Sequence, residues 1–121
     1  MAESPFKHID VTESHGVAIV GFVNSQLMFA NEMVEEVGGE LGRLLTDRGY
    51  TKIVLDFRNV QYLASMMLAR LAKLEQEIGR SKGQLKICGL GPILKDTMRI
   101  GHFERVFDIY DDVPSALKAM H

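Results

Sequence analysis

The fold of this chain is decided by the sequence KIVLDFRNVQYLASMML at residues 52–68. Its first six residues are mostly apolar rather than alternating, which is typical of a β-strand covered on both faces and therefore central in its sheet. A polar loop follows, and then apolar residues recur at the spacing of one helix face, at Met67, Leu71, Leu74 and Ile78. The segment therefore predicts a buried strand that leads through a loop into a helix.

Strands and helices alternate on both sides of this segment. Residues 6–22 contain two β-rich runs joined by the turn-forming sequence Glu13-Ser14-His15-Gly16, which predicts an N-terminal β-hairpin. Further helices are expected over 30–48, 92–100 and 113–120, the last capped by Asp112, and short strands over 85–88 and 106–110. Because strands that alternate with helices pair in parallel, the predicted fold class is α/β, with a mixed, mostly parallel β-sheet and about four α-helices.

Composition places the chain among soluble globular domains. Of its 121 residues, 46% are hydrophobic and 25% are charged, values close to the globular average. Neither a repeat nor a linker divides the sequence, so residues 1–121 are expected to form one domain. The formal net charge of −2, from 14 basic and 16 acidic residues, gives no electrostatic reason to expect a nucleic-acid partner.

The N-terminus and the cysteine count favour a cytoplasmic location. Residues 1–10 contain no apolar run of signal-peptide length, and no membrane partner is expected. Cys88 is the only cysteine, so it forms no disulfide within the chain and is interpreted as a small buried hydrophobe. The histidines lack metal-ligand spacing, and residues 89–91 lack the Gly-Lys-Ser/Thr of a phosphate-binding loop, so neither a metal nor a cofactor is expected.

Residues 53–68, together with 83–88, 90–92 and 101–110, resemble the STAS domain, the fold shared by sulphate transporters and bacterial anti-sigma-factor antagonists. The resemblance covers about Val17 to Met120. It implies a protein-binding regulator, not an enzyme, that captures an anti-sigma factor, a serine kinase of the ATPase-fold type, and so frees a sigma factor. In that family the partner kinase phosphorylates a serine, and Ser65 falls on this serine. This chain departs from the motif at Ala64, where the family has Asp, and at Met67, where it has Gly.

Functional groups in such sheets lie in the loops that follow the carboxyl ends of the strands, here 24–29, 58–65 and 89–92. The expected phosphorylation site is Ser65, and the expected partner-binding residues are Asn24, Gln26, Tyr62, Ala64, Ser65 and Met66. A phosphate at a helix start meets the positive end of the helix dipole and adds roughly −1.5 to −2 charges to the docking surface. The helical spacing also predicts a buried Met67 and an exposed Met66.

Two other interpretations of the site stay open. Ser65 can be only a helix N-cap, which would make the chain a non-phosphorylated STAS scaffold or adaptor that uses the same surface. Asp56 ends a central strand, as the phosphoaspartate of a receiver domain does, but residues 24–26 offer no carboxylate for Mg²⁺. Asp56 is therefore better interpreted as a hydrogen-bond acceptor that organises the loop. The chain is expected to be a monomer or a weak homodimer.

Overall fold

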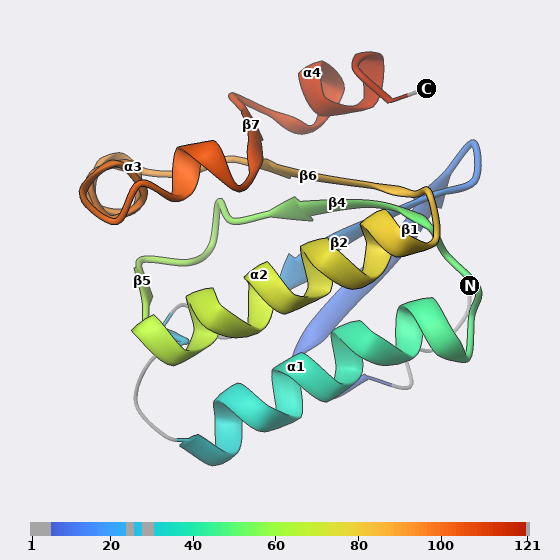
Figure 1. The fold of residues 1–121 in the computed structure, drawn as a ribbon, viewed down its shortest axis with the longest axis horizontal. Coiled ribbons are helices and arrows are strands. Elements are labelled where there is room, and N and C mark those ends of the chain that lie inside the picture. Colours follow the sequence, from blue (N-terminus) through green and yellow to red (C-terminus); the bar gives the residue numbers. More distant parts are fainter. Residues whose placement is uncertain (1–5, 24–25, 28–30, 121) are drawn as a thin grey trace.

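The computed structural model describes residues 6–23, 26–27 and 31–120, which form a sheet with helices on both faces (Figure 1). The five-stranded sheet has the spatial order β1 (Ile9–Ser14), β2 (Val17–Phe22), β4 (Lys52–Asp56), β6 (Gln84–Cys88) and β7 (Asp108–Tyr110). A two-stranded sheet pairs β3 (Gln26–Leu27) with β5 (Tyr62–Leu63). The helices are α1 (Asn31–Thr46), α2 (Ser65–Arg80), α3 (Pro92–Ile100) and α4 (Val113–Lys118), with a 3₁₀ helix, η1 (Phe103–Arg105).

The sheet topology confirms the predicted α/β class. β1 and β2 form the antiparallel hairpin, while β2–β4, β4–β6 and β6–β7 pair in parallel. The hairpin turn places His15 at φ 53° and Gly16 at φ 82°, and such a pair of positive φ angles suits the right-handed twist of the strands. β4 lies in the middle of the five strands, as its apolar composition predicts, and Ile53, Val54 and Leu55 have no exposed surface.

The two faces of the sheet are covered unequally. α1 and α2 cover one face over the larger core, where the stacked rings of Phe22 and Phe57 have centroids 4.9 Å apart. On the other face, α4 covers a small cluster that includes Cys88, which is fully buried as predicted. Burial, and then the charge of Asp56, raises the pKa of the Cys88 thiol to about 12. None of the helices in the described residues is long and apolar enough to cross a bilayer.

The start of β7 and the end of α1 differ from the expected boundaries. The last strand begins at Asp108 rather than at 106, because the N–H groups of Val106 and Phe107 both donate to the carbonyl of Phe103 at 2.9 Å and so close the η1 turn. α1 ends at Thr46, ahead of 48. The cap of α4 is as predicted, since Asp112 Oδ1 accepts the N–H of Ser115 at 2.9 Å.

Candidate functional site

The loop between β4 and α2 begins at a hydrogen-bonded carboxylate. Asp56 is only 8% exposed; its Oδ1 accepts the backbone N–H of Arg58 at 3.1 Å, and its Oδ2 accepts Arg58 Nε at 2.9 Å. A short polar side chain that accepts a backbone N–H two residues later forms an Asx turn. Asp56 is therefore the loop-organising acceptor that the sequence predicts.

The loop after β6 packs directly against this turn. The N–H of Phe57 donates to the carbonyl of Cys88 at 2.9 Å, and the N–H of Gly89 donates to the carbonyl of Asp111 at 3.2 Å. Gly89 has φ 76°, and a Cβ atom there would lie 2.6 Å from Asp56 Oδ1. Only glycine fits both this backbone conformation and this close approach. The connections that follow β4, β6 and β7 are thus fastened together at one edge of the sheet.

The short strands β3 and β5 bring two of the predicted loops together. They pair in parallel, with Gln26 opposite Tyr62 and Leu27 opposite Leu63. The connection before α1 therefore lies beside the connection that leads to Ser65. Of the expected partner-binding residues, Asn24 lies outside the described residues, and only the backbone of Gln26 is described.

Ser65 is the first helical residue of α2, and its side chain is exposed. The interpretation of Ser65 as an N-cap is wrong, because the N-cap is Ala64. Ala64 has extended backbone angles (φ −70°, ψ 152°), and its carbonyl already accepts the N–H of Leu68 at 3.0 Å. Its methyl side chain makes no capping hydrogen bond. The first N–H groups of α2 therefore have no side-chain acceptor among the described residues, and the first turn carries no acidic residue.

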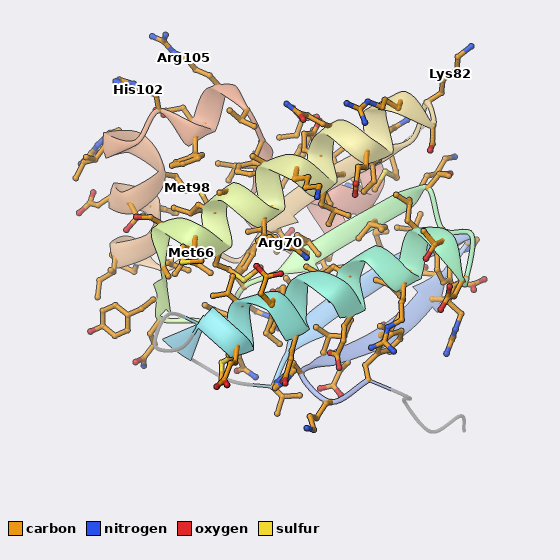
Figure 2. All side chains as sticks on the ribbon, turned by 60° about the horizontal axis from the view of Figure 1, so that its bottom comes forward. Met66, Arg70, Lys82, Met98, His102 and Arg105 are labelled. Carbon is orange, nitrogen blue, oxygen red and sulfur yellow. The ribbon has the colours of Figure 1, made fainter. Side chains whose placement is uncertain are left out.

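Exposed apolar side chains surround this helix start. Met66, labelled in Figure 2, is 45% exposed, and Met67 is fully buried. Both sequence predictions are thereby confirmed. Tyr62 is 37% exposed, and Ile93, at the start of α3, is 52% exposed. Met is flexible and polarizable, which suits adaptable binding surfaces. Together these side chains give the edge near Ser65 an apolar character, which is suited to contact with another macromolecule.

A surface pocket of about 450 Å³ connects the loop after β4 with the start of α3. Its lining includes Arg58, Gln61, Tyr62, Gly91, Ile93 and Leu94. Sequence reasoning placed Tyr62 in the partner surface and missed Ile93, although Ile93 and Ile100 are seven residues apart and so share one side of the predicted helix. No cluster of three or more His, Cys, Asp or Glu side chains that could hold a metal ion occurs among the described residues.

The family model of the STAS domain matches residues 8–116, so the chain belongs to this family. An anti-sigma factor antagonist from Mycobacterium paratuberculosis has a similar structure, with 20% identity, a TM-score of 0.80, and 98% of each chain covered. An anti-sigma-factor antagonist (STAS) domain protein from Planctomyces limnophilus is 22% identical with a TM-score of 0.79, covering 93% of this chain and 97% of that one.

A third similar structure is the Bacillus cell fate determinant SpoIIAA in its phosphorylated form. It is 11% identical with a TM-score of 0.68, and the alignment covers 92% of this chain and 97% of that one. At these identities the three structures show a shared fold. A search of curated protein sequences gives no match.

Proposed function

We propose that this chain is a non-catalytic regulator that acts as an anti-sigma-factor antagonist in the cytoplasm, with residues 1–121 as one domain. Its partner is an anti-sigma factor and serine kinase of the ATPase-fold type, which it captures so that a sigma factor is freed. The observation that carries the proposal is the exposed Ser65 at the first position of α2, flanked by exposed Tyr62 and Met66. Two structures of similar fold are described as anti-sigma-factor antagonists, which supports the same role here.

Phosphorylation of Ser65 is the proposed switch. A phosphate on Ser65 would lie beside the uncapped N–H groups of α2, at the positive end of the helix dipole. Ala64, where the family has Asp, places no carboxylate next to this phosphate. The similar fold of SpoIIAA in a phosphorylated form supports a modification of this type. The added charge of roughly −1.5 to −2 falls among apolar side chains and therefore disfavours docking.

The proposed partner surface consists of Asn24, Gln26, Tyr62, Ala64, Ser65 and Met66. Pairing of Gln26 with Tyr62 in the β3–β5 ladder supports treating the two connections as one surface. Exposed Met66 and Tyr62 supply apolar contact area, and the polar positions supply hydrogen bonds at its margin.

A phosphorylation assay distinguishes the proposed switch from the other interpretations. The chain is incubated with ATP and each of a panel of purified ATPase-fold serine kinases, and its peptides are analysed by mass spectrometry. Phosphate on Ser65 supports the switch. Phosphate on Asp56 supports a receiver-like domain, and tight kinase binding without phosphate supports a scaffold or adaptor.

The substitution Ser65→Asp places a permanent charge at the helix start. We expect it to weaken binding of the kinase by an order of magnitude or more, because the charge must be desolvated against an apolar surface. The thermal midpoint should stay nearly unchanged, since the side chain is exposed. Ser81→Asp, which adds the same charge at the exposed C-cap of α2, is the matched control and should bind like wild type. Equal affinity of the kinase for wild type and for Ser65→Asp would show that Ser65 does not lie in the interface.

A further inference from the structure

Helix α3 carries large apolar side chains on two sides. Leu94 and Met98, four residues apart, are each 1% exposed and form the side that packs on the core. Ile93 and Ile100, seven residues apart, share another side of the helix and are 52% and 77% exposed. Packing within the described fold therefore accounts for the first pair and leaves the second pair in water.

We name Ile93, Thr97 and Ile100 the α3 ridge. Thr97 lies between the two isoleucines at the same helical spacing, and its hydroxyl donates to the carbonyl of Ile93 at 3.0 Å. This polar group is thus satisfied within the helix and needs no partner of its own. A single exposed isoleucine on a surface is ordinary, whereas a stripe of apolar side chains along one side of a helix is typical of an interaction site.

The α3 ridge is continuous with the surface around Ser65. Ile93 lines the same pocket as Tyr62, and α3 is in contact with β5. Figure 1 shows α3, β5 and the start of α2 at the same end of the molecule. One partner that covers Ser65 and Met66 is therefore placed to reach along α3.

Charges beside the α3 ridge indicate the chemistry of the segment that covers it. Arg99 is paired with Asp96 at 2.7 Å, whereas Lys95, Arg105 and the acidic Glu104 have no ion-pair partner among the described residues, which leaves an excess of positive charge. Figure 2 shows Arg105, just beyond α3 in η1, extending away from the body of the fold. An apolar segment that also carries carboxylates complements this surface.

We infer that the α3 ridge is a second contact area for the same anti-sigma factor kinase, occupied by an apolar segment of that kinase that also carries acidic residues. This inference rests on the proposed function. Because the ridge does not include Ser65, it contributes affinity and partner choice that phosphorylation of Ser65 does not remove.

Site-specific photo-crosslinking in the native cell tests whether one partner covers both areas. A benzoylphenylalanine replaces Met66, Ile100 or, as a control at the far end of α2, Gly79, which is exposed and has open space around it. The same ATPase-fold kinase crosslinked from positions 66 and 100, but not from 79, supports the inference. If the kinase is crosslinked from position 66 alone, or if a different protein is crosslinked from position 100, the inference about the α3 ridge is wrong and the proposed function still stands. If no kinase is crosslinked from either position, both the inference and the proposed function are wrong.

The kinase crosslinked from position 66 is then purified and titrated with variants of the full chain. We expect Ile100→Glu to weaken binding at least tenfold, because the carboxylate would be desolvated in an apolar contact and repelled by the acidic residues of the segment. Gly79→Glu adds the same charge in the last turn of α2 and should bind like wild type. Circular dichroism should show both variants folded, since both positions are exposed. Wild-type affinity for Ile100→Glu overturns the inference even where Ser65→Asp impairs binding.

Discussion

The substitution Gly89→Ala tests the packing that holds the loop before Ser65. A non-glycine residue in the left-handed region, where Gly89 has φ 76°, costs about 1–2 kcal/mol. The new Cβ atom would also lie 2.6 Å from Asp56 Oδ1 and 2.9 Å from Arg58 Cγ. Relieving this clash separates Asp56 from Arg58, and a lost hydrogen bond to a charged group costs about 1.5–3 kcal/mol. We therefore expect the free energy of unfolding to fall by about 2.5–5 kcal/mol.

Urea unfolding followed by circular dichroism measures this loss. For a chain of this size 1 kcal/mol corresponds to about 4 °C, so the thermal midpoint should fall by about 10–20 °C. Gly39→Ala is the matched control: it is helical, a Cβ atom there meets nothing within 4 Å, and alanine should stabilise the helix by about 1 kcal/mol. A loss below about 1 kcal/mol for Gly89→Ala would refute the reasoning, because the left-handed conformation alone costs that much.

Three further predictions concern buried groups away from the proposed docking surface. The carboxylate of Glu40, which is 5% exposed, accepts the backbone N–H groups of Lys7 at 2.7 Å and His8 at 2.9 Å. Glu40→Ala should therefore lower the free energy of unfolding, measured by urea titration, by about 2–4 kcal/mol. A change under about 1 kcal/mol would contradict this role of Glu40. Because the pKa of Cys88 rises from 9.0 to about 12 on folding, burial of the thiol stabilises the fold below pH 9, and stability should fall as the pH rises from 9 towards 12. Because folding buries the Cys88 thiol and raises its pKa, iodoacetamide at about pH 8 should label Cys88 far more slowly in buffer than in urea. Equal rates would show an accessible thiol.

Periodic apolar patterns predict most of this fold because long elements repeat their signal over several turns or residues. The apolar run at 52–57 indicates a central strand, and the spacing that begins at Met67 indicates α2. The two-residue strands β3 and β5 are too short to show any period, and their pairing joins segments far apart in the chain. They could not be predicted from local sequence.

The sequence predicts that the candidate site lies between β4 and α2, but it does not predict which residue caps α2 or which apolar residues of α3 are exposed. Serine is a preferred N-cap and alanine is not, so the sequence left open whether Ser65 caps α2, whereas the backbone places Ala64 at the cap. The exposure of Ile93 and Ile100 was not evident, because α3 has apolar residues on two sides and the sequence does not say which side faces the sheet. The packing of Leu94 and Met98 on the core determines which side of α3 is buried and leaves Ile93 and Ile100 exposed.

The β3–β5 ladder joins the loop before Ser65 to a segment that lies much earlier in the sequence. Because Gln26 pairs with Tyr62 although 36 positions separate them in the sequence, a substitution in β3 acts through the ladder on the loop that leads to Ser65. Under the proposed function, partner preference can then be changed from β3 without substitutions in the loop between β4 and α2. If the chain acts as proposed, a variant library confined to β3 would shift which kinase is recognised while leaving Ser65 in place.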